Sequence, residues 1–248
     1  MRVLVSGLGG HMGVEVGRLA QSGFRGAVLV GGVSLDGVAP FSVPCAPDFS
    51  TAETDVDCVV DFSHHACTEE LLAFVTEHRL PLVLATTGQT EQERQAIRKA
   101  SETVPLFFAA NYSMGVALLI ELAKKAAAAL PEAEIEIVET HHDRKLDAPS
   151  GTALTIAEAI RQVRPAATVH AGRSGQGKRT PEEIGIHAVR MGNIVGIHEV
   201  ILGTENQTIT LKHEAYSRAL FAEGALAAAE FLMGKPAGLY DMTSLISL

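Results

Sequence analysis

The segment R-V-L-V-S-G-L-G-G-H-M-G, residues 2–13, decides the fold of the first half of this chain. Its first five residues form an apolar run typical of a short buried strand, and a helical pattern begins behind the glycines. Gly7 permits a tight turn, and Gly13 allows the helix to pack closely on the strand. Gly9 or Gly10 lets a pyrophosphate approach the backbone. This order of strand, glycine-rich turn and helix predicts a dinucleotide-binding unit.

The residues that follow continue this alternation of strand and helix. Alternation of this kind implies a parallel, doubly wound sheet, and ligands bind such sheets at the carboxyl ends of the strands. We therefore predict an α/β fold with a Rossmann-like dinucleotide-binding domain over residues 1–112, completed by a C-terminal segment, residues 221–248. The further apolar strands are predicted at residues 27–33, 56–62, 81–85 and 105–109, and the helices near residues 66–78 and 91–102.

The second half has a different pattern, which predicts a smaller α+β domain over residues 113–220. A helix over 113–130 leads into it and ends at Pro131. Four alternating segments suggest a mixed four-stranded sheet, covered by helices on one face and available for oligomerisation on the other. A Gly-rich and basic segment, Gly172–Arg179, reads either as a solvated connector or as a lid or interface arm. The strands are predicted at residues 134–139, 185–190, 194–202 and 208–214, and a second helix at 153–163.

Composition narrows the class of protein. The chain has 248 residues, of which 47% are hydrophobic and 20% charged, as in an ordinary globular enzyme. Its formal net charge of −9 disfavours nucleic acid and anionic membranes as partners. The three cysteines (Cys45, Cys58 and Cys67) lack metal spacing and read as reduced thiols. With no signal peptide and no stretch suited to span a bilayer, we expect a cytoplasmic protein.

Side chains suited to catalysis gather in E-T-H-H-D-R-K-L-D-A-P-S-G-T-A, residues 139–153. His141, His142 and Lys145 follow a strand, and the step at residues 150–152 opens a helix. A helix N-terminus suits a carboxylate or phosphate, because its first N–H groups have no partner within the helix. The adjacent histidines point to opposite faces of a strand, and no Cys or carboxylate cluster completes a zinc-like set, so we expect no metal. A hydrogen-bonded structural histidine is the alternative to catalysis here.

This segment closely resembles the H-H-x-x-K-x-D-A-P-S-G-T-A signature of the dihydrodipicolinate reductase (4-hydroxy-tetrahydrodipicolinate reductase) family. The resemblance implies that His141 donates and accepts a proton and that Lys145 is a second donor. It implies that His142 contacts a dicarboxylate substrate, whose carboxylate is held at the helix start by Ser150, Gly151 and Thr152. It further implies reduction with NADH or NADPH in lysine and diaminopimelate biosynthesis, and a homotetramer.

The resemblance extends to the first half, where a T-T-G loop and an A-A-N-Y loop match cofactor-lining loops of the family. Ser34 stands near the place where many Rossmann proteins carry an acidic residue that favours NAD, and no arginine follows to bind the 2′-phosphate of NADP. The choice between NADH and NADPH therefore stays open. The residues expected at the cofactor are Gly7, Leu8, Gly9, Gly10, His11, Met12, Ser34, Ala85, Thr86, Thr87, Ala109, Ala110, Asn111 and Tyr112.

Two other functions fit the dinucleotide-binding pattern. One is another Rossmann oxidoreductase of amino-acid metabolism, such as an aspartate-semialdehyde or homoserine dehydrogenase. The former needs a cysteine nucleophile, and none of the three cysteines has a suitable partner in the sequence. The other is a cofactor sensor without catalytic activity, against which His141 and Lys145 argue. Oxidation of NADH in the presence of substrate discriminates between these possibilities.

Overall fold

A computed structural model describes residues 1–246 and divides the chain into two compact units. The first unit comprises Met1–Ser113 together with the C-terminal segment that begins at Ala219, and the second unit comprises Met114–Arg218. The last two residues of the predicted completing segment, 221–248, lie outside the described residues. Among the helices of the described range, none has the length and apolar character needed to cross a bilayer.

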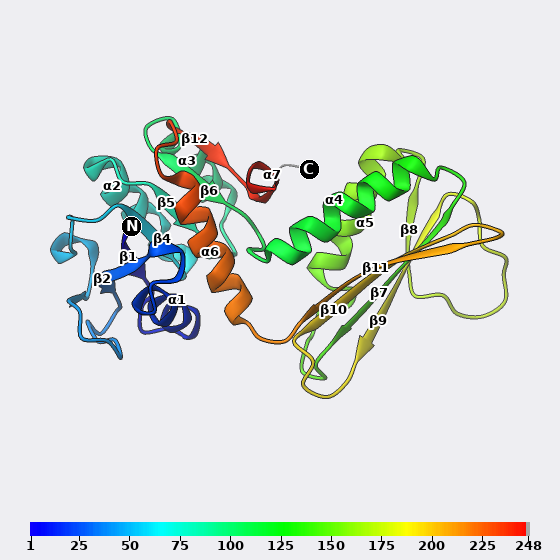
Figure 1. The fold of residues 1–248 in the computed structure, drawn as a ribbon, viewed down its shortest axis with the longest axis horizontal. Helices are drawn as coiled ribbons and strands as arrows, with labels where there is room; N and C mark the ends of the chain where they lie inside the picture. The colour runs from blue at the N-terminus through cyan, green and yellow to red at the C-terminus, as the bar shows by residue number, and fades with distance from the viewer. Residues whose placement is uncertain (247–248) are drawn as a thin grey trace. The chain divides into compact units, whose positions relative to one another are not determined.

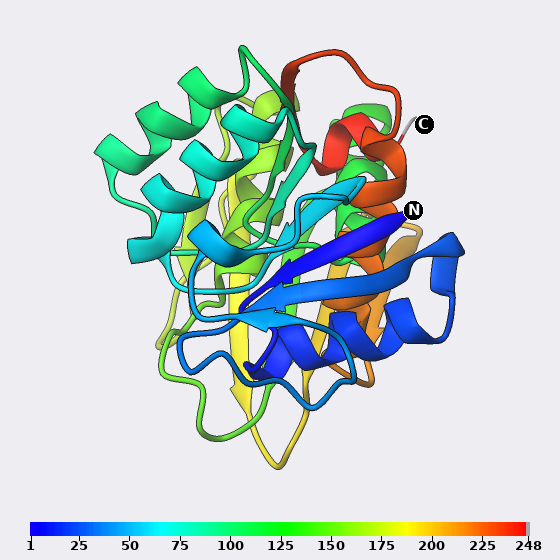
Figure 2. The same cartoon turned by 90° about the vertical axis from the view of Figure 1, so that its left-hand side faces the viewer.

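The first unit is built on a parallel sheet of seven strands in the order β12-β6-β5-β4-β1-β2-β3 (Figure 1). Helices α1 and α6 pack together on one face, and α2 and α3 pack together on the other (Figure 2). The predicted Rossmann-like class is confirmed. The elements are β1 (Arg2–Ser6), α1 (His11–Gln21), β2 (Val28–Val33), β3 (Cys45–Ala46), β4 (Cys58–Asp61), α2 (Thr68–His78), β5 (Leu82–Leu84), α3 (Glu91–Ala100), β6 (Pro105–Phe108), α6 (Ala219–Leu232), β12 (Gly238–Tyr240) and α7 (Met242–Leu245), with 3-10 turns at Phe24–Gly26, Phe49–Thr51 and His65–Cys67.

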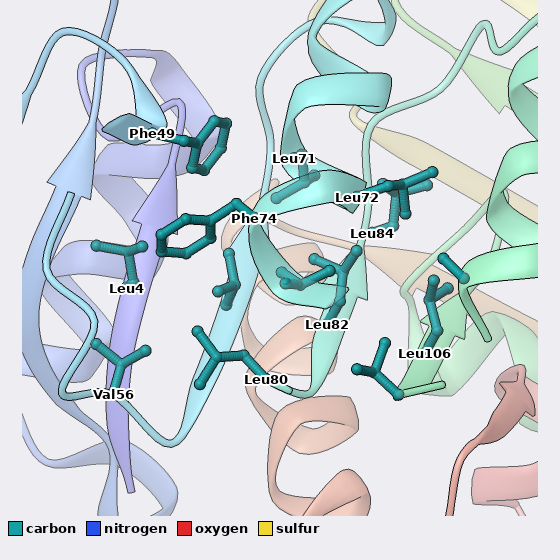
Figure 3. Close-up of a cluster of buried hydrophobic side chains, with 14 of the residues drawn as sticks. Leu4, Phe49, Val56, Leu71, Leu72, Phe74, Leu80, Leu82, Leu84 and Leu106 are labelled. Atoms are coloured by element: carbon teal, nitrogen blue, oxygen red, sulfur yellow. The ribbon is translucent and has the colours of Figure 1, made fainter. Parts of the chain in front are cut away.

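Apolar side chains between the sheet and α2 and α3 form the core of this unit (Figure 3). Leu4, Leu82 and Leu106 come from three strands and are fully buried. Leu71 and Phe74 lie three residues apart on α2, so they share the face of the helix that packs on the sheet. Because both faces of the sheet are covered, its strands read as continuous apolar runs, and this made them recognisable in the sequence.

Two strands of the first sheet carry no signal in the sequence. Strand β3 is two residues long and β12 is three residues long, so neither shows a periodicity. Both are edge strands, and each pairs in parallel with one neighbour, β2 and β6 respectively. Strand β12 also shows that the C-terminal segment adds to the first sheet.

The second unit holds a mixed sheet of five strands in the order β11-β10-β7-β9-β8. Strands β7, β8 and β9 are parallel, whereas β10 and β11 are antiparallel to their neighbours. Helices α4 and α5 pack against each other over one face of this sheet (Figure 1). The elements are α4 (Met114–Ala129), β7 (Glu134–His141), α5 (Gly151–Val163), β8 (Thr168–Ala171), β9 (Glu183–Arg190), β10 (Gly196–Gly203) and β11 (Thr208–Ala215).

The predicted count of four strands in this sheet is wrong, because β8 is a fifth. The four residues of β8, T-V-H-A, alternate polar and apolar side chains, but the segment is too short for a clear period and all four residues are exposed, so no buried face marks it. It pairs only with β9 and forms an edge of the sheet. The mixed α+β character of the unit agrees with the prediction.

Candidate active site

A pocket of about 540 Å³ lies in the first unit, where the carboxyl ends of β1, β4, β5 and β6 meet. The strand order reverses between β1 and β4, which is the topological switch point at which open α/β sheets bind ligands. The lining comes from the loops that follow these strands and from the start of α6. Its residues are Met12, Phe62, Ser63, His64, Ala85, Thr86, Thr87, Ala110, Asn111, Tyr112 and Phe221.

The glycine-rich turn next to this pocket fits a dinucleotide. Gly7 has a φ of +79°, and a Cβ there would lie 2.6 Å from the carbonyl oxygen of Phe62. A Cβ at Gly13 would lie 2.0 Å from the carbonyl oxygen of Gly7, so α1 can begin here only with glycine. Gly10 is the N-cap of α1, and no side chain caps this helix start. Its N-terminal amides therefore suit the pyrophosphate of a dinucleotide.

The residues expected at the cofactor fall into three groups. Those at the pocket surface are Met12, Ala85, Thr86, Thr87, Ala110, Asn111 and Tyr112, and those in the turn at the start of α1 are Gly7, Leu8, Gly9, Gly10 and His11. Ser34 and Ala109 do not line the pocket. Leu8 is 0% exposed as a whole residue, so it belongs to the core behind the turn and offers no accessible surface to a ligand. Ser34 donates a hydrogen bond from its hydroxyl to Asp36 Oδ1 at 2.9 Å.

The buried carboxyl group of Asp61 holds the loops that line the pocket through hydrogen bonds. Asp61 is 1% exposed at the end of β4, and its Oδ2 accepts a hydrogen bond from the Thr86 hydroxyl at 2.6 Å. The Ser63 amide donates to its Oδ1 at 3.2 Å, and the Ser6 hydroxyl is a further partner. Burial raises the pKa of Asp61 more than these hydrogen bonds lower it. Asp61 thus connects the end of β1 with the loops that follow β4 and β5.

In the second unit, a carboxylate lies directly behind the first histidine of the signature. Glu139 is 0% exposed, and its Oε2 lies 2.6 Å from Nδ1 of His141. The two residues are two positions apart on β7, so both point to the face that the helices cover. Along this face of β7 the last core residue is Ile137, and the polar cluster begins with Glu139, the next residue that points the same way.

Two more groups bind the same carboxylate. Arg190, from the end of β9, donates to both oxygens of Glu139, with Nη1 at 2.8 Å from Oε2 and Nη2 at 2.7 Å from Oε1. The backbone amide of Ser150 donates to Oε1 at 3.0 Å. Burial alone would raise the pKa of Glu139, but these hydrogen bonds together with that of His141 hold it below its usual value.

His141 is close to a second buried histidine. The ring of His198, on β10, meets that of His141 edge to face with 5.2 Å between centroids. Burial lowers the pKa of both rings, that of His198 to about 4, and His198 Nε2 shares a hydrogen bond of 3.1 Å with the Ser150 hydroxyl. His142 follows β7, and its Nδ1 is buried without a hydrogen-bond partner.

The loop from Lys145 to Thr152 forms the rest of the site. Lys145 Nζ lies 2.8 Å from Asp147 Oδ1, and this hydrogen bond lowers the pKa of Asp147. Ser150 is the N-cap of α5: its hydroxyl accepts from the amide of Ala153, and the residue is only 2% exposed. Gly151 is exposed at the first position of the helix. The expected substrate residues thus lie together at one end of the second unit.

Comparison with known proteins agrees with this geometry. Residues 1–112 match the family model described as "Dihydrodipicolinate reductase, N-terminus", and residues 115–246 match "Dihydrodipicolinate reductase, C-terminus". The chain belongs to the dihydrodipicolinate reductase family. Among its relatives, the 4-hydroxy-tetrahydrodipicolinate reductases of Caldanaerobacter subterraneus subsp. tengcongensis and Clostridium tetani are 43% and 38% identical, over 99% and 100% of this chain and 98% and 97% of theirs.

A solved structure of the family has the same fold. The dipicolinate-bound dihydrodipicolinate reductase from Paenisporosarcina sp. TG-14 superimposes with a TM-score of 0.83 at 27% identity. The alignment covers 100% of this chain and 99% of that one. Membership in the dihydrodipicolinate reductase family therefore rests on both units and on both sequence and structure.

The structure also brings Glu139, Arg190 and His198 to the site. Glu139 opens the segment that carries the family signature, but none of these three residues was predicted to belong to the site. The spacing of Glu139 and His141 was a usable signal, since residues i and i+2 of a strand share a face. Arg190 and His198 come from other strands and carried no local signal. At the pocket, Phe62, Ser63 and His64 directly follow a strand end, whereas Phe221 enters from the distant C-terminal segment.

The acidic side chains of the second-unit cluster are paired with basic ones. Within residues 1–246, no group of three or more His, Cys, Asp or Glu side chains is placed to hold an ion. The acidic side chains nearest the histidines, Glu139 and Asp147, are already bound to Arg190 and Lys145. The cluster in the second unit is suited to proton transfer and to binding anions.

Proposed function

We propose that this chain is a 4-hydroxy-tetrahydrodipicolinate reductase of lysine and diaminopimelate biosynthesis. It takes 4-hydroxy-tetrahydrodipicolinate, a reduced nicotinamide cofactor and a proton, and it releases tetrahydrodipicolinate, the oxidised cofactor and water. The observation that carries the proposal is the match of both halves of the chain to the family, together with the clustering of His141 and Lys145. The bound NADH or NADPH supplies the hydride.

Residues of the second unit bind the substrate and handle the proton. We assign to His141 the role of general acid, which protonates the ring carbon next to the one that is reduced. Lys145 stabilises charge and donates on the side of the ring nitrogen. The start of α5, at Gly151 and Thr152, binds a substrate carboxylate with its amides, and His142 contacts the ring or the second carboxylate. Ser150 supports this helix start through its hydroxyl cap on Ala153.

Residues of the first unit hold the cofactor. The amides at the start of α1 bind the pyrophosphate, and the loops that carry Thr86, Thr87, Ala110 and Asn111 line the nicotinamide end of the pocket. Ser34 cannot repel a 2′-phosphate as an acidic residue would, so both NADH and NADPH serve as cofactors. Ser34→Asp shifts the preference toward NADH through like-charge repulsion.

We further propose that four copies associate through the uncovered face of the second-unit sheet. Val138, Val189 and Ile197 lie on this face, opposite the helices; Val138 and Ile197 are half-buried, and Val189 is 38% exposed. Exposed apolar side chains on a sheet face favour association with another copy. Sedimentation equilibrium tests this proposal, with a mass of four chains as the expected result.

The function is tested by steady-state oxidation of NADH and of NADPH, with substrate generated in situ by the synthase that precedes this step. We expect turnover with both cofactors, and a ratio of kcat/KM values below about 100-fold, which equals about 2.7 kcal/mol. If a folded protein bound NADH but turned over substrate with neither NADH nor NADPH, the result would instead favour a cofactor sensor without catalytic activity. If NADH or NADPH were oxidised in the presence of aspartate semialdehyde but not of 4-hydroxy-tetrahydrodipicolinate, the result would favour another oxidoreductase.

A further inference from the structure

Four donors converge on the carboxylate of Glu139, and none of them is substrate. They are Nδ1 of His141, both terminal nitrogens of Arg190 and the amide of Ser150. The carboxylate is 0% exposed, so it cannot contact a ligand itself. A buried carboxylate with this many charged and amide donors stays ionised, because each bond stabilises the charged form. An ionised carboxylate only accepts hydrogen bonds, and this property constrains its neighbours.

The ionised carboxylate of Glu139 restricts which nitrogen of His141 can carry a hydrogen. At 2.6 Å from an acceptor, Nδ1 of His141 must carry a hydrogen, so the neutral ring has its lone pair on Nε2. The space beside Nε2 is open because residue 196 is glycine: a Cβ there would lie 3.1 Å from Nε2. The proton that His141 gains and loses is therefore the one on Nε2.

We propose that Glu139, held ionised by Arg190, is a positioning residue that keeps the proton of neutral His141 on Nδ1 and makes Nε2 the atom that transfers protons. The inference rests on the proposed role of His141 as general acid. Through Oε1, the same carboxylate binds the amide of Ser150 and thereby ties the histidine to the N-cap of α5. The buried Glu139 carboxylate thus fixes both the tautomer of His141 and the position of the N-terminus of α5.

Other charged groups act on the same ring. Lys145 from the loop after β7, Arg190 from β9 and His198 from β10 face His141, and His213 on β11 lies beyond His198. Burial lowers the pKa of His141, and the two cations lower it further, whereas Glu139 is the group that raises it. Removal of the Glu139 charge therefore moves this pKa down. Because a general acid is active only while protonated, the fall of kcat with rising pH then begins at a lower pH.

The first test uses the unaltered protein. With ¹⁵N-labelled histidine, the nitrogen chemical shifts of His141 show which nitrogen carries the proton in the neutral ring, and the spectrum of His141→Gln identifies the signals. We expect the hydrogen on Nδ1. A neutral ring that is protonated on Nε2 overturns the inference without any change at Glu139.

The second test is Glu139→Gln. In this variant the amide oxygen satisfies the Ser150 amide and one Arg190 nitrogen, so the amide NH₂ faces Nδ1 and drives the hydrogen of His141 to Nε2. We expect this tautomer change, a shift of the kcat profile to lower pH, and a loss of about 10- to 100-fold in kcat, the size seen when the carboxylate behind a metal-binding histidine is removed. KM for NADH should stay within about twofold. An unchanged tautomer or an unchanged pH profile in folded Glu139→Gln overturns the inference.

Glu183→Gln is the matched control. Glu183, at the opposite end of β9 from Arg190, is 6% exposed and also binds an arginine, Arg173, and a backbone amide, that of Thr180, but no histidine. The Glu183→Gln variant should leave the His141 nitrogen signals and the pH profile of kcat unchanged. Full turnover of His141→Gln would disprove the proposed role of His141, whereas an inactive His141→Gln with an unaltered Glu139→Gln would disprove the positioning role alone.

Discussion

Two buried carboxylates lie beneath the two sites of this molecule, and they differ in what binds them. Asp61 in the first unit accepts hydrogen bonds from the hydroxyls of Thr86 and Ser6 and from the amide of Ser63. Glu139 in the second unit accepts from a guanidinium, an imidazole and an amide. The side chains are 1% and 0% exposed, so burial alone does not distinguish them.

The partners move the two pKa values in opposite directions. For Asp61, burial outweighs the neutral donors and the pKa is raised, whereas for Glu139 the hydrogen bonds of Arg190, His141 and Ser150 outweigh burial and the pKa is lowered. A carboxylate held by neutral donors can shape a pocket, since it orients hydroxyl groups. A carboxylate held by cations can also fix a charge and a tautomer. The first arrangement suits cofactor binding and the second suits proton transfer.

The largest effect that we expect tests whether chemistry belongs to the second unit. His141→Gln should lower kcat by roughly 10²–10⁴-fold, because it removes the general acid, and should leave the affinity for NADH unchanged. Steady-state kinetics and NADH titration measure both quantities. His187→Gln is the control, since His187 also binds a carboxylate, that of Glu136 at 3.0 Å, but on the other face of the sheet. Near-normal turnover of folded His141→Gln would contradict the assignment.

The contrast between the carboxylates predicts unequal losses of stability. Glu139→Gln should lower the free energy of unfolding by about 3 kcal/mol, because it leaves the Arg190 charge without its partner. Asp61→Asn should change it by less than about 1 kcal/mol at neutral pH, because it replaces a buried carboxyl group that has only neutral donors with a neutral amide of the same size. Urea unfolding at pH 7 measures both. A larger loss for Asp61→Asn than for Glu139→Gln would show that the charge of the partner does not decide the cost.

Acid should destabilise the protein through His198. Its pKa of about 4 in the folded protein is below the ordinary value of 6.5. Between these values the unfolded chain binds a proton that the folded chain does not, so stability falls as pH falls from about 6.5 to about 4, by at most roughly 3 kcal/mol. His198→Gln should remove this part of the pH dependence. Unfolding curves across this range test it, and His170→Gln on the exposed strand β8 should keep the wild-type slope.

The smallest effect concerns substrate binding at the start of α5. Thr152→Val should raise KM for the substrate by an amount equivalent to roughly 1.5–3 kcal/mol, because it removes a donor to a carboxylate. KM for NADH should not change, since the cofactor is assigned to the first unit. Initial rates with each reactant varied in turn separate the two constants. A variant that mainly weakened NADH binding would overturn the division of roles between the units.

Local patterns in the sequence predicted elements whose neighbours along the chain determine them. Gly7 to Gly13 marked the first turn and helix because only glycine fits the close contacts there, and covered parallel strands appear as apolar runs. The exposed edge strand β8 and the very short β3 and β12 were missed, because they depend on backbone pairing with distant strands and are too short to show a clear period.

The sequence by itself determined the family, the order of the longer elements, and the histidine, lysine and helix start of the signature, since these follow from short-range spacing. The tertiary structure alone decided that Arg190 from β9 and His198 from β10 flank Glu139 and His141 on β7. Their contacts result from the register of strands that lie some fifty residues apart in the chain. A register depends on burying the apolar faces of both strands together, so the sequence of one strand alone does not show which residue of a distant strand lies beside it.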